Sequence, residues 1–155
     1  MAQEKHKFPY AGFNFEITID GFNDEESLFQ EVSGISGELQ FETVNPGGEN
    51  NTTLKLPTRS KFSNLVLKKG MTDAGSKLIS WCSDCILDLS NLDKFENKKK
   101  NVTLNLLNEK RKSVCTWVFI DCYPVKWEIS GINAVKSEIA LETIELAYKY
   151  FKITN

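Results

Sequence analysis

The stretch FNFEITID at residues 13–20 alternates apolar and polar side chains at every position. Successive side chains of a β-strand point to opposite faces, so a strict period of two predicts a strand with one buried face. Gly21 and the pair Asn23-Asp24 follow at once, and these residue types favour turns. The segment is therefore predicted to be a half-buried β-strand that ends at a turn.

Similar patterns recur along the rest of the chain. Apolar residues at strand spacing predict further strands at residues 28–32, 38–44, 62–67, 102–107, 114–122 and 125–129. Residues 45–53 read NPGGENNTT, which is polar and rich in turn formers, and are predicted to form an exposed loop. Pro57 cannot donate a backbone hydrogen bond, so its strand must lie at a sheet edge or be interrupted. Cys122-Tyr123-Pro124 is expected to form a corner between the last two strands.

One segment, at about residues 73–87, has the spacing of a helix. Thr72 or Asp73 can cap its amino terminus. Its apolar stripe consists of Leu78, Trp81, Cys82, Cys85 and Leu89. We expect one helix of about four turns that packs this stripe against a sheet.

These elements predict a mainly β protein, an antiparallel β-barrel or sandwich of seven to eight strands with one packed α-helix. The 155 residues fit one domain over residues 1–155, with residues 1–12 as a flexible or contact arm. The strand at 114–122 carries apolar side chains on both faces, which suggests burial on both sides.

Composition excludes several classes of function. Nineteen basic residues face 21 acidic ones, so the net charge of −2 disfavours nucleic-acid binding. Residues 1–7 are polar and no apolar stretch approaches the length of a membrane span, so we expect no secretory signal and no stable membrane binding. The protein is expected to be made in the cytoplasm.

The four cysteines are Cys82, Cys85, Cys115 and Cys122, and the first two form a C-x-x-C pair. A zinc site normally needs a second close pair, and His6 is the single histidine. We expect four buried free thiols and no metal or cofactor; a metal or redox site at the C-x-x-C pair is the alternative.

Residues suited to catalysis are scarce. His6 lies in a polar tail, so a serine or cysteine nucleophile has no histidine base. Gly47-Gly48 lacks the following Lys-Ser or Lys-Thr of a phosphate-binding loop. Paired carboxylates of a glycosidase are the remaining enzyme alternative. We expect no catalytic residues and no enzymatic activity.

An ordered set of motifs resembles the contractile tail tube family. The motifs are FxFxIxIDG at 13–21, FQEVSGI at 29–35, GGEN at 47–50, KLPxRxKFxNLxLKKG at 55–70, Trp81, WxFxxCYPVKW at 117–127, SGINA at 130–134 and ETIELA at 142–147. The family includes phage tail tubes, tubes of extracellular contractile injection particles and, more distantly, the type VI secretion tube protein. The resemblance runs from about residue 13 to the end of the chain.

The resemblance implies a hexameric ring that closes through an inter-subunit β-barrel and stacks into a tube. The implied partners are further copies of the chain, a sheath protein, baseplate or spike and tube-terminating proteins, and cargo effector or DNA in the lumen. Assembly would take place in the bacterial cytoplasm, as part of a phage-tail-like particle or virion. A tube-initiator or baseplate subunit of the same fold, and a small-ligand-binding β-barrel, are the alternatives.

The family resemblance also implies a strand over about residues 136–151. Composition alone favours a helix there, because Ala, Glu, Leu and Lys dominate the segment.

Two groups of site residues follow. The loop at 45–61 is expected to contact neighbouring subunits or rings, with Arg59 and Glu49 as ion-pairing residues. Its contact candidates are Asn45, Pro46, Gly47, Gly48, Glu49, Asn50, Pro57, Arg59 and Lys61. The channel wall is expected to be hydrophilic, so that cargo slides without binding. Its candidates are Glu38, Gln40, Glu42, Glu138 and Glu142, whose alternative place is the outer surface facing the sheath.

Overall fold

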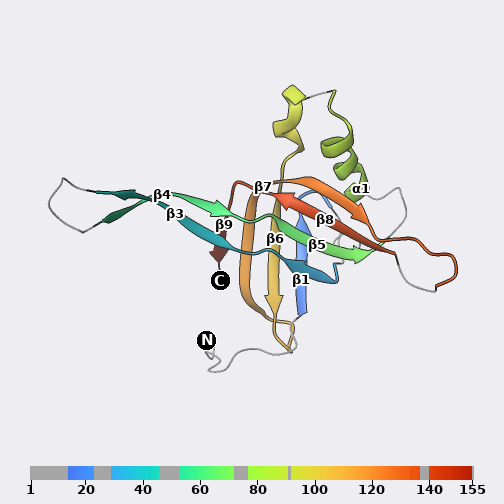
Figure 1. Ribbon diagram of the computed structural model, residues 1–155. Helices are drawn as coiled ribbons and strands as arrows, with labels where there is room; N and C mark the ends of the chain where they lie inside the picture. The colour runs from blue at the N-terminus through green and yellow to red at the C-terminus, as the bar shows by residue number, and fades with distance from the viewer. Residues whose placement is uncertain are drawn as a thin grey trace.

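Antiparallel strands make up most of the computed structural model, which describes residues 14–22, 29–45, 53–71, 77–90, 92–136 and 140–154 (Figure 1). The strands in this part of the chain are β1 (Asn14–Ile19), β2 (Glu31–Ser33), β3 (Gly37–Val44), β4 (Leu54–Phe62), β5 (Leu65–Gly70), β6 (Lys100–Leu107), β7 (Ser113–Ile129), β8 (Leu141–Ala147) and β9 (Tyr150–Thr154). Helical residues form α1 (Lys77–Cys82), the π-helical turn η2 (Ser83–Leu87) and the 3-10 helix η3 (Leu92–Lys98). The predicted mainly β, antiparallel fold is confirmed, and the described residues form nine strands where seven to eight were expected.

Seven strands form one sheet in the order β1-β6-β7-β8-β5-β2, with β9 also paired to β7. The first half of β7 pairs with β6 and β9, and its second half pairs with β8. The sheet therefore has two parts. We call β2, β5, β8 and the second half of β7 the four-strand layer, and β1, β6, β9 and the first half of β7 the second layer. In Figure 1 the strands of the two layers cross.

The corner predicted at Cys122-Tyr123-Pro124 is a bend inside one strand. Asp121 has a positive φ of 55°, and the register with β8 shifts between Pro124 and Lys126. These irregularities turn the chain without ending it, as β-bulges do. The prediction of two separate strands is therefore wrong, and the 17 residues of β7 connect the two layers.

The core lies between the layers and under the helix. Buried side chains come from the second layer, the four-strand layer and α1–η2: Ile17, Ile19, Val102, Leu104, Phe119 and Cys122; Leu65, Leu67, Ile144 and Leu146; Leu78, Trp81, Cys82 and Cys85. The predicted helical stripe is confirmed at four positions. Leu89 is an exception, because the helix ends at Leu87 and leaves Leu89 62% exposed. Residues 72–76, with the predicted helix cap, lie outside the described residues.

The C-terminal segment is a strand, as the resemblance implied, but its extent differs. β8 and β9 are separated by Tyr148 and Lys149, and residues 134–136 are not in a strand. Every second residue of β8 is buried, at Glu142, Ile144 and Leu146. Pairing with β5 on one side and β7 on the other outweighs helix propensity here.

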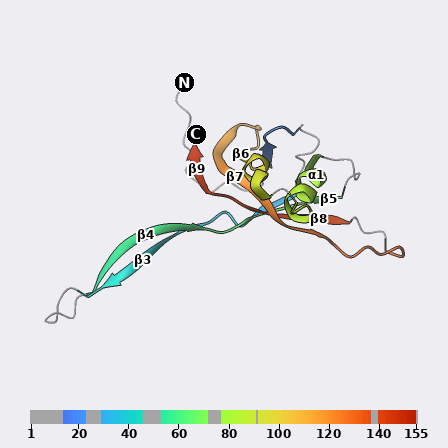
Figure 2. The ribbon, with the colours of Figure 1, turned by 90° about the horizontal axis from the view of Figure 1, so that it is seen from above.

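β3 and β4 form a separate two-stranded hairpin that projects from the rest of the fold (Figure 2). Pro57 lies in β4, whose second edge has no partner strand among the described residues, so the prediction of an edge position is confirmed. At the base of the hairpin, Gly34 has a φ of +86°, and a Cβ there would meet the backbone oxygen of Asn64 at 2.2 Å. Only glycine fits at the point where these two segments of the chain cross.

Candidate assembly surfaces

The four-strand layer has two open edges. β5 lies between β2 and β8, and β8 lies between β5 and β7. On its other side β7 pairs with β6 only as far as Cys122, so Tyr123–Ile129 has no partner strand there within the described residues. β2 is the last strand of the sheet that the described residues form. An open edge presents unpaired N–H and C=O groups, which another strand can bind.

The two faces of this layer differ in polarity. One face packs into the core through residues such as Leu67 and Ile144. Register places the alternate residues on the other face, which we call the polar face: Glu31, Ser33, Lys68, Lys126, Glu128, Thr143 and Glu145. Val66 and Leu141, both half-buried, are apolar members of the same face.

Charges on the polar face lie beside opposite charges or amides. Lys68 Nζ is 3.8 Å from Glu31 Oε2, and Lys126 Nζ is 3.7 Å from Glu128 Oε2. Asn64 Nδ2 donates to Glu145 Oε1 at 2.8 Å. With three Glu and two Lys, this face carries a net charge of −1 per chain. It is hydrophilic and close to neutral.

Glu142, predicted to line the channel, does not lie on this face. Its side chain is fully buried, and Oε1 accepts a hydrogen bond from Trp127 Nε1 at 2.7 Å. It pairs in register with Lys69, which is 2% exposed. Side chains alternate between the two faces of a strand, and position 142 lies on the core-facing side of β8 together with Ile144. A carboxylate enclosed within its own chain cannot line a channel, so this prediction is wrong; Glu138 lies outside the described residues.

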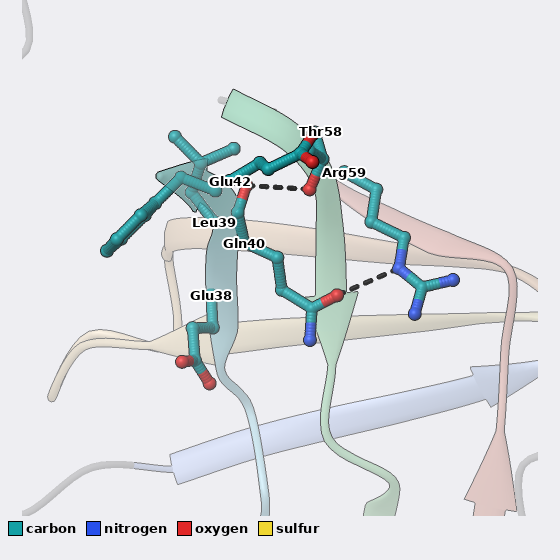
Figure 3. Close-up of a pocket in the computed structure, with 7 residues that line it drawn as sticks. Glu38, Leu39, Gln40, Glu42, Thr58 and Arg59 are labelled. Carbon is teal, nitrogen blue, oxygen red and sulfur yellow. Dashed lines mark hydrogen bonds between the residues drawn. The ribbon is translucent and has the colours of Figure 1, made fainter. Parts of the chain in front are cut away.

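Glu38, Gln40 and Glu42 share one face of the hairpin. Arg59 Nε donates to Gln40 Oε1 at 2.8 Å, and Thr58 Oγ1 donates to the Gln40 backbone oxygen at 3.1 Å (Figure 3). Thr58 is the extra residue where the register shifts. These residues line a shallow depression of about 470 Å³.

The hairpin also exposes large apolar side chains. Leu39 and Phe41 are 55% and 52% exposed on the face shared with Phe62. Leu54 and Leu56 are 54% and 51% exposed on the opposite face. Phe62 anchors the base of the hairpin, with its ring centroid 5.3 Å from that of Phe151. A ribbon that buries neither face against its own chain is suited to contact another molecule.

Of the predicted contact residues, Asn45, Pro57, Arg59 and Lys61 are exposed on or beside the hairpin strands. Pro46, Gly47, Gly48, Glu49 and Asn50 lie outside the described residues. The observed partner of Arg59 is Gln40. Sequence reasoning missed the polar face, although the alternation in ETIELA and KWEI carries the signal.

All four cysteines are free, and three of them are buried. Cys115 is only half-buried, which corrects the prediction for that residue. Burial raises the pKa of Cys82 and of Cys122 to about 12, and raises that of Cys85. Such thiols stay protonated at neutral pH and are poor nucleophiles.

In the part of the chain that the structure describes, no three His, Cys, Asp or Glu residues gather as a metal site, and no helix is long and apolar enough to cross a bilayer.

The two edges of the antiparallel layer and the exposed apolar side chains of the projecting hairpin are surfaces that another molecule can contact. The model of the family "T4-like virus tail tube protein gp19" matches residues 11–152, and the chain belongs to this family of structural tube proteins. A comparison with curated protein sequences finds no significant match.

Solved structures with a similar fold include chains of an extracellular contractile injection system. A chain in the cryo-EM structure of the PVC extracellular contractile injection system sheath–tube complex is 22% identical, with a TM-score of 0.74 over 96% of this chain and 93% of that chain. A chain in the anti-feeding prophage baseplate is 24% identical, with a TM-score of 0.71 over 96% and 97%. Hcp1 from Flavobacterium johnsoniae is 14% identical, with a TM-score of 0.53 over 90% and 93%.

Proposed function

We propose that six copies of this chain close into a ring, and that the rings stack into the inner tube of a contractile injection system. The observation that carries the proposal is the pair of open edges on the four-strand layer. Each copy has one edge at β2 and one at β7, so edge-to-edge pairing uses a different surface on each partner. A contact of this kind forms a closed ring when the rotation between copies allows it.

Strand directions support edge pairing. Within the layer every neighbouring pair is antiparallel, so β2 and β7 at its two edges run in opposite directions. Rotation about a ring axis keeps each strand's direction along that axis, so β7 of one copy meets β2 of the next in antiparallel orientation. Six layers of four strands give about 24 strands, and with a spacing of about 4.8 Å and a tilt of about 40° the barrel is roughly 48 Å across.

In such a ring the polar face lines the lumen. The core-facing side of the layer is covered by the second layer and α1, so the polar face is the side left for a channel. Sixfold repetition turns its net charge of −1 into about −6 per ring, spread among neighbouring charge pairs. This wall offers passing cargo, an effector or DNA, few apolar side chains to bind.

The hairpin supplies contacts between subunits or rings. Its exposed apolar side chains, among them Phe41 and Leu56, would be buried there. The remaining candidates Glu38, Gln40 and Glu42 belong to this contact surface or to the rim of the lumen. The further partners are a sheath protein around the tube, baseplate or spike proteins, and tube-terminating proteins. Assembly takes place in the bacterial cytoplasm, and the protein acts as a structural part without catalytic activity.

A second candidate is a tube-initiator or baseplate subunit of the same fold. The similarity to a chain in the anti-feeding prophage baseplate favours it. A subunit that only starts the tube would form rings that do not polymerise.

Sedimentation velocity and negative-stain electron microscopy of the purified protein test both candidates. We expect sixfold rings that stack into tubes at high concentration. Rings that never stack would favour the initiator. A monomer at millimolar concentration would refute ring formation, and a ring structure whose lumen is lined by Phe, Leu and Ile, or by a dominant Lys and Arg surface, would refute the proposed wall.

A further inference from the structure

Two exposed surfaces lie at opposite ends of β6. The strand begins at Lys100, just after η3 ends at Lys98, and it ends at Leu107, just before the turn at residues 108–112. Eight residues at about 3.3 Å each separate the two surfaces by roughly 26 Å. In Figure 1 the helical segment lies above the strands and the turn lies below them.

The first surface is a leucine patch at the end of the helical segment. Leu87, Leu89 and Leu92 are 66%, 62% and 63% exposed, although they lie within six consecutive positions. Exposed apolar side chains are common on a surface singly, but a group of large ones marks a contact site.

The leucine patch is flanked by negative charge. Asp84, Asp88 and Asp93 are exposed, and Lys94 is the single base between positions 84 and 94, which gives this stretch a net charge of −2. Hydrogen bonds from Ser90 lower the pKa of Asp88, so its carboxylate stays ionised. Lys98 Nζ donates to the backbone oxygens of Asp84 at 2.6 Å and Asp88 at 3.5 Å, and its charge also lowers the pKa of Asp88. It offsets one of the two negative charges and leaves a net charge of −1 beside the leucine patch.

The second surface is the turn between β6 and β7, which we call the basic turn. Lys110, Arg111 and Lys112 are consecutive and exposed, and with Glu109 they give a net charge of +2. Asn108 Oδ1 accepts hydrogen bonds from the backbone N–H groups of Lys110 and Lys112, both at 2.9 Å. Arg111 has a positive φ of 59°. The two hydrogen bonds to Asn108 hold the turn in this conformation. Arg111 Nη2 lies 3.7 Å from Glu16 Oε1, so Glu16 offsets one of the positive charges and leaves a net charge of +1. Lys110 and Lys112 make no ion pair with another described residue.

We propose that the basic turn of one copy docks on the leucine patch of the next copy around the ring, an inference that rests on the proposed ring. The charges of the two surfaces are complementary, +1 when Glu16 is counted with the turn and −1 when Lys98 is counted with the patch. The aliphatic stems of lysine and arginine can cover leucine side chains while their cations reach the flanking aspartates. The surfaces lie at opposite ends of β6, so each copy uses its turn toward one neighbour and its patch toward the other.

This contact differs from the edge pairing of the four-strand layer. β6 belongs to the second layer, and its turn and the helical segment are not part of the polar face or of the open edges. Edge pairing joins neighbouring copies along the wall of the lumen. The second contact joins them farther out, and so fixes the angle between adjacent subunits.

Charge exchange across the contact provides the test. Asp93→Lys and Lys110→Glu each place like charges opposite one another, and we expect either change to raise the midpoint concentration of ring formation at least tenfold. The double variant restores opposite charges with exchanged signs and should return the midpoint to within about threefold of the wild type. An equimolar mixture of the two single variants should also regain assembly, because every contact joins opposite charges in a ring that alternates the two variants.

Lys152→Glu is the matched control, since it makes the same charge change at an exposed position of β9. Leu89→Ser tests the apolar part and should weaken assembly without lowering the stability of the monomer. Circular dichroism and urea unfolding of each variant verify that the monomer is folded.

The outcomes separate this inference from the proposed function. A wild-type protein that never forms rings refutes the proposed function and, with it, the inference. Wild-type rings together with unaffected single variants refute the inference alone, and a partner other than a second copy then occupies the leucine patch. Folded single variants that lose rings, with a double variant that does not regain them, also refute it.

Discussion

Replacing Ile129 with proline tests whether the open edge of β7 pairs with a neighbouring subunit. Ser130 N–H donates to the backbone oxygen of Leu141 at 2.8 Å, so position 130 points its backbone groups toward β8. Backbone direction alternates along an antiparallel strand, and Ile129 therefore points its N–H and C=O toward the open edge. Proline is tolerated where an edge N–H faces solvent, so the monomer should keep its fold.

The expected rise in the midpoint concentration of ring formation follows from the number of interfaces in a ring. Each interface loses one hydrogen bond and leaves one carbonyl without a donor, a cost of about 2 kcal/mol. Six interfaces make about 12 kcal/mol per ring. The association constant of a hexamer scales with the inverse fifth power of the midpoint concentration, so about one fifth of this free energy appears in the midpoint. The midpoint concentration should therefore rise by roughly 60-fold.

Sedimentation velocity over a concentration series measures this midpoint directly. Ile129→Val keeps the N–H group and removes only one methylene, so its midpoint should stay within about twofold of the wild type. If Ile129→Pro is folded by urea unfolding and still assembles at the wild-type concentration, this edge is not the site of pairing.

Three other predictions concern the core, the loop and the thiols. Glu142→Ala should lower the free energy of unfolding by about 2 kcal/mol, because it leaves the Nε1–H group of the half-buried Trp127 without its acceptor, and unfolding in urea measures the loss; a loss below about 0.5 kcal/mol would contradict the assigned hydrogen bond. Deleting residues 47–51 should leave the domain folded and block tube growth in electron micrographs, and tubes of normal length would disprove a contact role for that loop. A pKa of about 12, compared with the ordinary 9.0, should slow alkylation of folded Cys82 at pH 8 by about a thousandfold, as followed by peptide mass spectrometry; a rate equal to that in urea would contradict its burial.

Much of the fold could be predicted because its signals are local. The alternation at residues 13–20 predicted β1, and the apolar stripe from Leu78 to Cys85 predicted the helical segment α1–η2. The strand at residues 141–147 could not be derived from composition, since its partners β5 and β7 are distant in the sequence. For this segment the family resemblance predicted a strand, whereas the helix propensity of its residues predicted a helix.

The candidate site was harder to predict, because a strand pattern shows which residues share a face but not which face is buried. Glu142 was expected on a polar surface, whereas the structure pairs it in register with Lys69 and encloses both. Glu145, three positions on, points the other way and belongs to the polar face. The assignment depends on the position of the core, which is set by contacts between distant segments.

The continuity of β7 has a mechanical consequence. One strand of 17 residues belongs to both layers, so the wall of the proposed channel and the outer part of the subunit are joined by backbone rather than by a loop. Force applied to the outside of such a subunit would pass into the channel wall through covalent bonds and a close-packed core of low compressibility. A tube built in this way would resist buckling while it is driven forward, because its inner and outer surfaces cannot slide past each other.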